Sequence, residues 1–102
     1  MSSATQKTVR DDYVDLTGFQ RDILWKISHL GGAAYGLKIK EELEAMGYGE
    51  VNHGRLYPNL DDLVRNGFIE KSELDKRTNE YALTDEANKL LSDRRSWERG
   101  DA

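Results

Sequence analysis

Cysteine is absent from this chain, and proline occurs only once among its 102 residues. Without cysteine the chain can form no disulfide, no thiolate zinc site and no thiol-based redox switch. No apolar run approaches the roughly 20 residues that a membrane-spanning helix requires. The polar N-terminus, MSSATQKTVRDDYVD, also lacks the apolar core of a signal peptide. We therefore expect a cytoplasmic protein with no membrane partner.

Charged residues are plentiful but their balance is acidic, with 15 Lys and Arg against 19 Asp and Glu and a net charge of −4. Binding to DNA depends largely on basic side chains that neutralise phosphates, so this balance argues against a generic nucleic-acid-binding protein. An acidic surface can also reflect a high-salt cytoplasm. Any binding to DNA would then depend on a few locally placed cations. The length allows one domain with a modest core, so we expect the terminal segments to find cover in a second subunit.

Two helices are predicted in the first half of the chain. The first begins at Thr17, whose hydroxyl can form a capping box with Gln20, and ends at the Gly31-Gly32 pair. The second covers about residues 36–46, with Leu37, Ile39, Leu43 and Met46 as its apolar positions. Between these helices no strand is assigned, although residues 32–35 leave room for a short one.

A third helix is predicted to begin near Asn52, a favourable capping residue, and to end at Asn66-Gly67. Leu56, Leu60, Leu63 and Val64 form its buried stripe. Pro58 conflicts with a regular helix because it lacks an amide donor. We therefore expect this helix to have an irregular start.

Two strands, residues 68–74 and 80–83, flank a charged turn at residues 75–79. Thr84 then caps a fourth helix that carries Asp85 and Glu86 in its first turn. The predicted fold is mainly α with a small β-hairpin (α+β), in the order α-α-α-β-β-α. Three helices followed by a two-stranded wing are typical of the winged helix-turn-helix, in which the third helix enters the major groove of DNA.

The start of the third helix holds the candidate base-reading residues. Side chains there reach base edges when such a helix enters the groove, and an arginine can contact guanine through two hydrogen bonds. The residues in question are Asn52, His53, Gly54, Arg55, Tyr57 and Asn59. For Arg55 the plainer alternative is a solvated surface residue, and for Tyr57 it is a ring that covers the edge of the core. Gly54 suits either a close backbone approach or a tight helix entry.

Candidate contacts to the DNA backbone lie in two other segments. The wing tip contains Lys76, Arg77, Thr78 and Asn79, and a basic hairpin tip is suited to reaching phosphates. The alternative is a solvated turn whose charges protect strand edges. Tyr35 and Lys38, at the entry to the second helix, are further candidates because a helix N-terminus presents amides to phosphate.

Catalytic and cofactor chemistry find little support in the sequence. There is no nucleophile elbow, no phosphate-binding glycine loop and no cluster of metal ligands. His29 and His53 are too far apart in sequence to suggest a metal site. We expect neither an enzyme nor a bound cofactor.

Several motifs taken together resemble those of the PadR-type winged-helix transcription regulators. They are Asn-His-Gly-Arg-Leu-Tyr-Pro-Asn-Leu at residues 52–60, Gly-Phe-Ile at 67–69 and Tyr-Ala-Leu-Thr at 81–84. The Gly-Phe-Gln-Arg-Asp-Ile-Leu run at 18–24 and the Tyr-Gly-Leu turn at 35–37 also fit the family. The resemblance spans about residues 17–91, and the acidic, cysteine-free composition is similar to that of haloarchaeal members.

The resemblance implies a homodimer that binds double-stranded operator DNA. It divides the chain into an N-terminal arm (1–16), a winged helix-turn-helix domain (17–84) and a C-terminal dimerisation helix (85–102). Candidate dimer residues are Tyr13, Val14, Leu16, Leu90, Leu91 and Trp97. Two half-sites would then form an inverted-repeat operator. The alternatives are a winged-helix module that binds other proteins in a transcription or assembly complex, and a sensor with a ligand at the dimer interface.

Overall fold

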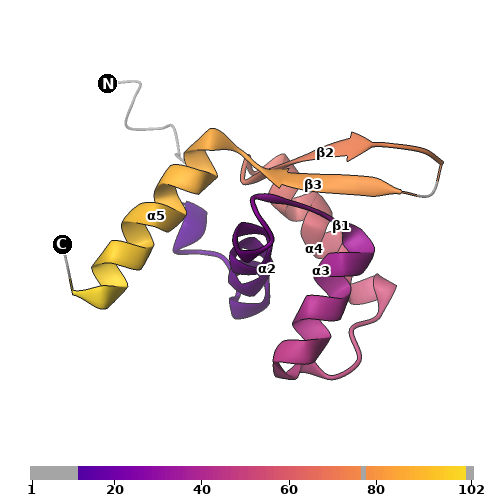
Figure 1. Cartoon of the computed structure of the whole chain (residues 1–102), viewed down its shortest axis with the longest axis horizontal. Helices are drawn as coiled ribbons and strands as arrows, with labels where there is room; N and C mark the ends of the chain where they lie inside the picture. The colour runs from indigo at the N-terminus through magenta and orange to yellow at the C-terminus, as the bar shows by residue number, and fades with distance from the viewer. Residues whose placement is uncertain (1–11, 77, 101–102) are drawn as a thin grey trace.

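A computed structural model of the chain describes residues 12–76 and 78–100. The elements run in the order α2 (Gly18–His29), β1 (Ala33–Tyr35), α3 (Gly36–Leu43), a π-helical turn η2 (Glu44–Tyr48), α4 (His53–Arg65), β2 (Ile69–Glu73), β3 (Asn79–Leu83) and α5 (Asp85–Arg99). The β2–β3 hairpin projects to one side of the helices and α5 to the other (Figure 1). The predicted wing and the predicted dimerisation helix therefore point away from each other.

The sheet has three antiparallel strands in the order β1-β3-β2, so the predicted order without a strand between the first two helices is incomplete. Tyr81 of β3 lies opposite Ala34 of β1 on one side and Lys71 of β2 on the other. The strand β1 is only three residues long. So short a segment shows no alternation of polar and apolar residues, and only its pairing with β3 defines it.

Local capping determines where the helices begin and how they join the sheet. The predicted capping box of α2 is confirmed, with Thr17 Oγ1 accepting from the Gln20 amide at 3.1 Å and Gln20 Oε1 accepting from the Thr17 amide at 3.2 Å. After α2, Gly32 adopts a φ of +98°, which favours glycine. Its carbonyl oxygen then accepts from the Leu83 amide at 2.8 Å and ties the end of α2 to β3.

The irregular start expected for the third helix is wrong, because α4 runs without a break from His53 through Pro58 to Arg65. Asn52 caps it as predicted. An interior proline costs a helix about 3 kcal/mol. Leu56, Leu60 and Leu63 are fully buried, and each contributes about 1.5–3 kcal/mol of hydrophobic stabilisation. Their combined burial outweighs the cost of the proline.

The second helix also differs from expectation. Regular α3 ends at Leu43, and the following turn includes Gly47 at a φ of +126°. Ile39 and Leu43 are buried, whereas Leu37 is 60% exposed and Met46 is 45% exposed. Only half of the predicted apolar positions therefore face the core. The exposed Leu37 lies next to the hairpin, as described below.

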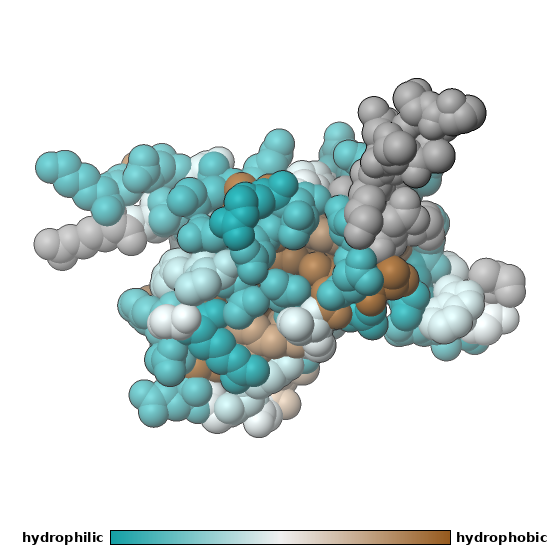
Figure 2. Space-filling model, turned by 180° about the vertical axis from the view of Figure 1, so that it is seen from behind, coloured by the Kyte–Doolittle hydropathy of each residue, from teal (hydrophilic) through white to brown (hydrophobic). Residues whose placement is uncertain are grey.

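The core lies between α2, α3, α4, the sheet and the first half of α5. Its members are all hydrophobic: Tyr13, Phe19, Ile23, Leu24, Ile27, Ala34, Ile39, Leu43, Val51, Leu56, Leu60, Leu63, Phe68, Ile69, Tyr81, Leu83, Ala87, Leu90 and Leu91. Seen from behind, hydrophilic side chains cover the hairpin and much of the body, and hydrophobic surface gathers mainly in the middle of the face and on the side toward α5 (Figure 2). The burial of Leu90 and Leu91 fixes the first half of α5 to the domain.

Candidate nucleic-acid interface

The first turn of α4 faces solvent because the helix buries only one stripe. Leu56 is fully buried, while His53, Gly54 and Arg55 are exposed. Asn52 Oδ1 accepts from the Arg55 amide at 2.9 Å, so this side chain is engaged in capping. A Cβ at Gly54 would meet only Asn52 Oδ1 at 3.4 Å, an ordinary contact. Packing within the chain therefore does not require glycine at this position, which leaves the surface open to close approach from outside.

The Arg55 guanidinium lies over two aromatic rings. Its Cζ is 4.0 Å from the centroid of the Phe19 ring and 5.2 Å from that of Tyr48. The two rings meet edge to face at 5.1 Å. Among the residues that the structure describes, no carboxylate forms an ion pair with Arg55. Its charge is therefore held by aromatic faces, and within the described residues its N–H donors are left for an external acceptor.

Tyr48 is itself anchored by Asp22. The Tyr48 hydroxyl donates to Asp22 Oδ2 at 2.6 Å. This hydrogen bond raises the pKa of Tyr48 above its usual value, with smaller contributions from burial and from the charge of Asp22. The ring below Arg55 is therefore fixed to α2 through its hydroxyl.

Asn59 occupies a different environment from the one predicted. Its Oδ1 accepts from Gln20 Nε2 at 3.0 Å, and its Nδ2 donates to the Arg55 carbonyl at 2.7 Å. The side chain is half-buried between α4 and α2. Both of its polar ends thus have partners within the chain, and its observed role is to join the two helices.

A groove of about 310 Å³ connects α4 with the start of α3 and the hairpin. It is lined by Tyr35, Gly36, Leu37, Tyr57, Thr78 and Asn79. The Tyr57 ring lies directly against Gly36, since a Cβ there would be only 2.7 Å from Tyr57 Oη. The His53 ring meets Tyr57 edge to face at 5.2 Å. The structure therefore brings together predicted residues from three separate segments.

The cations near this groove are flanked by acidic residues. Lys38 Nζ is 3.5 Å from Glu42 Oε2, one turn along α3. Lys76 lines a second, shallower depression with Glu73 and Asp75 at the hairpin tip. Arg77, also predicted to contact DNA, lies outside the described residues. The groove itself is lined by uncharged side chains.

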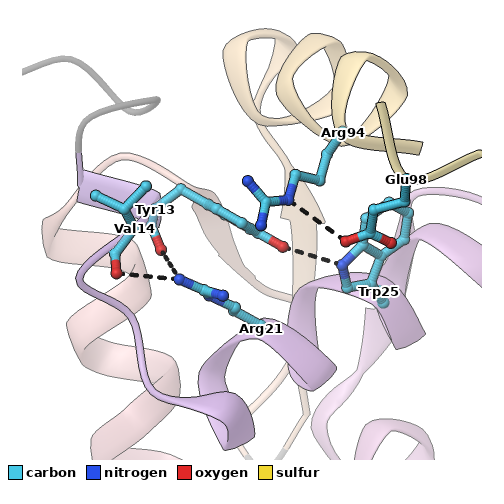
Figure 3. Close-up of polar contacts among 6 residues, drawn as sticks. All are labelled: Tyr13, Val14, Arg21, Trp25, Arg94 and Glu98. Atoms are coloured by element: carbon cyan, nitrogen blue, oxygen red, sulfur yellow. Dashed lines mark hydrogen bonds and ion pairs between the residues drawn. The ribbon is translucent and has the colours of Figure 1, made fainter. Parts of the chain in front are cut away.

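A second polar cluster joins the segment before α2 to α5 (Figure 3). Arg21 Nη2 donates to the carbonyl oxygens of Tyr13 and Val14, at 3.2 and 3.0 Å. Trp25 Nε1 donates to Tyr13 Oη at 3.2 Å. Arg94 lies over the Tyr13 ring at 5.3 Å and pairs with Glu98. The cluster fixes the chain before α2 against the domain.

This packing corrects part of the predicted dimer surface. Tyr13, Leu90 and Leu91 are 2%, 5% and 1% exposed, so they are buried within a single copy of the chain. The three residues belong to the same hydrophobic core, and α5 packs against β3. Leu16 is partly buried against the same core. Of the six candidates, Val14 and Trp97 remain well exposed, at 62% and 59%.

Several residues that shape the site were not among the candidates. Phe19, Asp22 and Tyr48 surround or support Arg55, and Gln20 holds Asn59. The capping pattern locates the start of α2, but no local signal indicates that this start faces α4. In residues 12–76 and 78–100 no group of His, Asp or Glu is arranged to hold a metal ion. No helix there is long and apolar enough to cross a membrane.

Comparisons with known proteins agree with this geometry. The model of the transcriptional regulator PadR-like family matches residues 25–93. The complex structure of hsRosR-S1 is 59% identical, with 85% of this chain and 76% of that chain covered and a TM-score of 0.79. A structure of H. salinarum RosR grown from NaBr is 60% identical, with 82% of this chain and 74% of that chain covered and a TM-score of 0.76.

More distant structures share the fold. PadR of Bacillus subtilis in complex with operator DNA is 23% identical, with 76% of this chain and 46% of that chain covered and a TM-score of 0.57. The comparison with curated proteins found no match. The winged helix-turn-helix fold and the extent of the family match lead to one conclusion: this chain belongs to the PadR-like family of transcriptional regulators.

Proposed function

We propose that this DNA-binding transcription regulator acts as a homodimer on an inverted-repeat operator. The start of α4 enters the major groove, and the hairpin lies along the adjacent backbone. The observation that carries this proposal is the groove that joins α4, the start of α3 and the hairpin, because one DNA strand can contact all three. In winged helices these elements are the ones that approach the duplex.

Arg55 is the principal base-reading residue in this proposal. It is exposed in the first turn of α4, and its guanidinium N–H groups match the two acceptors on the major-groove edge of guanine. His53 is exposed beside it, and Gly54 lets the backbone come close. Asn52 contributes through the cap that fixes this turn. The side chain of Asn59 supports Arg55 through the Arg55 carbonyl.

Contacts to the sugar–phosphate backbone come from the groove and the wing. Tyr35, Tyr57, Thr78 and Asn79 offer hydroxyl and amide donors, and neutral donors hydrogen-bond phosphate without releasing many counterions. Lys76 adds charge at the hairpin tip, and Arg77 follows it in the sequence. Lys38 contributes less because Glu42 already offsets its charge.

Dimerisation is proposed to use the second half of α5. Beyond Leu91 this helix leaves the core, and Trp97 is exposed on it. Val14 is exposed on the segment that Arg21 and Tyr13 fix nearby. A second copy would cover these side chains. Two α4 helices related by two-fold symmetry would then read two half-sites of opposite orientation.

Relatives support the same assignment. The structure of PadR from Bacillus subtilis and that of a MarR mutant from E. coli were both determined with operator DNA, and both share this fold. RosR, at 59% identity, is the nearer guide to the details of this chain.

The wing contact is tested by Lys76→Ala, with Lys89→Ala as the matched control. Lys89 is exposed on α5, so both variants change the net charge equally. If Lys76 contacts phosphate, Lys76→Ala weakens binding to selected and random duplexes alike and lowers the slope of log K against log salt by about 1. Equal slopes for the two variants would exclude Lys76 from the interface.

A further inference from the structure

The surroundings of Arg55 come from three separate elements. Phe19 lies in the first turn of α2, Tyr48 ends η2, and Arg55 lies in the first turn of α4. Phe19 is 6% exposed and belongs to the core, so its ring is fixed. Tyr48 stands edge to face against it at 5.1 Å. The guanidinium therefore rests on a surface that the fold itself determines.

Hydrogen bonds hold both the Tyr48 ring and the backbone of Arg55. Asp22 holds the Tyr48 hydroxyl at 2.6 Å, which keeps the ring from turning away. Asn59 accepts from Gln20 and donates to the Arg55 carbonyl at 2.7 Å, which ties this turn of α4 to α2. The Asn52 cap fixes the Arg55 amide. The side chain and the main chain of Arg55 are thus each held by separate contacts.

A cation over an aromatic ring is attracted by the negative face of the ring. A guanidinium held in this way keeps its N–H donors at the edge of its plane. It also loses less conformational freedom on meeting a base than a freely moving side chain does. The ring surface therefore favours a fixed direction for the donors, and direction is what distinguishes one base pair from another.

We propose that Phe19 and Tyr48 form an aromatic platform that positions Arg55 for base reading, with Asp22 as the anchor of the platform. Tyr48, Phe19 and Asp22 are thus positioning residues that set base preference without touching DNA. This proposal rests on the proposed base contact of Arg55. It adds that base preference depends on side chains outside α4.

The test measures base preference at each position of the site. Each purified protein selects duplexes from a random-sequence library, and the bound fraction is sequenced. Arg55→Ala should lose preference at one base pair of each half-site by about tenfold or more. Tyr48→Leu, which removes the ring, should reduce preference at that same base pair by about two- to fivefold. Tyr48→Phe keeps the ring but loses the hydrogen bond to Asp22, and it should have a smaller effect at the same position.

Tyr13→Phe is the matched control for these variants. Tyr13 also has a hydrogen-bonded hydroxyl and an arginine over its ring, but it lies on the side of α5. The base preference of the Tyr13→Phe variant should equal that of the unchanged protein. Thermal unfolding of each variant shows that it is folded. A purely structural role for Tyr48 would lower affinity for all sequences equally and leave the preference at each position unchanged.

The outcomes separate the two proposals. If Arg55→Ala loses preference at one base pair and both Tyr48 variants keep it, the platform is overturned while base reading by Arg55 stands. If Arg55→Ala itself keeps the preference, base reading by Arg55 fails, and the platform fails with it. Loss at the same base pair in Arg55→Ala and Tyr48→Leu, with Tyr13→Phe unchanged, supports the platform.

Discussion

Two clusters in this protein combine an arginine with aromatic rings and a hydrogen-bonded tyrosine. At α4, Arg55 lies over Phe19 and Tyr48, and Tyr48 donates to Asp22. At α5, Arg94 lies over Tyr13 and Trp97, and Tyr13 accepts from Trp25. The parts are alike, but the α5 arginine is paired with Glu98 at 3.4 Å.

The two clusters differ in whether the arginine is paired with a carboxylate. At α5 the guanidinium is shared between rings and a carboxylate, and Tyr13 below it is buried. That arrangement holds the segment before α2 to the domain. At α4 the rings hold the guanidinium from one side, and within the described residues no carboxylate pairs with it. One cluster is therefore suited to holding the fold together and the other to contact with an anion or a base.

Removal of the two tyrosine rings tests this distinction most strongly. Tyr13→Ala should lower the free energy of unfolding by about 3–5 kcal/mol, because it leaves a cavity in the core. Tyr48→Ala should cost clearly less, because Tyr48 is only partly buried. Chemical denaturation of both variants measures the gap. Equal losses would mean that the α4 cluster is as structural as the α5 cluster.

Trp97 tests whether the outer half of α5 is an interface. Trp97→Ser should leave the stability of the single copy nearly unchanged, since the side chain is 59% exposed. It should weaken the dimer by about 2 kcal/mol or more if Trp97 is central to the contact. Sedimentation over a range of concentrations measures this effect. Lys89→Ser, on the same helix, is the control, and a dimer that both variants leave intact would place the interface elsewhere.

Gly36→Ala tests the groove beside the α4 cluster. The new Cβ would be 2.7 Å from Tyr57 Oη and 3.2 Å from two of its ring carbons, so the Tyr57 ring must move into the groove. We expect binding to all DNA sequences to weaken by about 1 kcal/mol, the contribution of a typical hydrogen bond. Fluorescence anisotropy with a random duplex measures the loss.

Two further variants complete the Gly36 experiment. Tyr57→Phe added to Gly36→Ala removes the closest atom, so the double variant should bind better than the additive sum predicts. Gly18→Ala is the control, because a Cβ there has no atom within 4 Å. Undiminished binding by Gly36→Ala would show that DNA does not use the groove.

Local chemistry explains which features could be predicted from the sequence. The capping box of Thr17 and Gln20 and the Asn52 cap involve residues three apart, so the chain itself specifies them. The hairpin follows from two runs that flank the charged turn at residues 75–79, and the helix after it follows from the Thr84 cap, which is also confirmed. These features place α4 and the wing correctly before any tertiary contact is known.

The features that could not be predicted depend on contacts between distant residues. Asn59 meets Gln20 across 39 positions of sequence, and nothing near Asn59 indicates that partner. The strand β1 exists through its pairing with β3. Leu90 and Leu91, predicted as part of the dimer surface, are instead buried in the core of a single copy of the chain. Helical spacing identifies an apolar face, but it does not show whether the same chain or a second copy covers that face.

The smallest expected effect concerns the turn that carries Tyr48. Glu44 Oε2 accepts from the Val51 amide at 2.8 Å and from Lys40 Nζ at 2.9 Å, and so it joins α3 to the segment before α4. These two contacts, the Val51 hydrogen bond first, lower the pKa of Glu44 below its ordinary value. A carboxylate with a lowered pKa stabilises the fold above the unfolded-state pKa, about 4.3 for glutamate.

Glu44→Gln should therefore be less stable than the unchanged protein at neutral pH. The gap should shrink as the pH falls below about 4 and through the lowered pKa of the folded state. Urea denaturation at several pH values measures it, with Glu41→Gln, an exposed position in the preceding helix α3, as the control. A gap that stays constant with pH would mean that Glu44 acts through its shape and not its charge. A gap that closes in acid while base preference is retained would separate the stability of this turn from the platform that it carries.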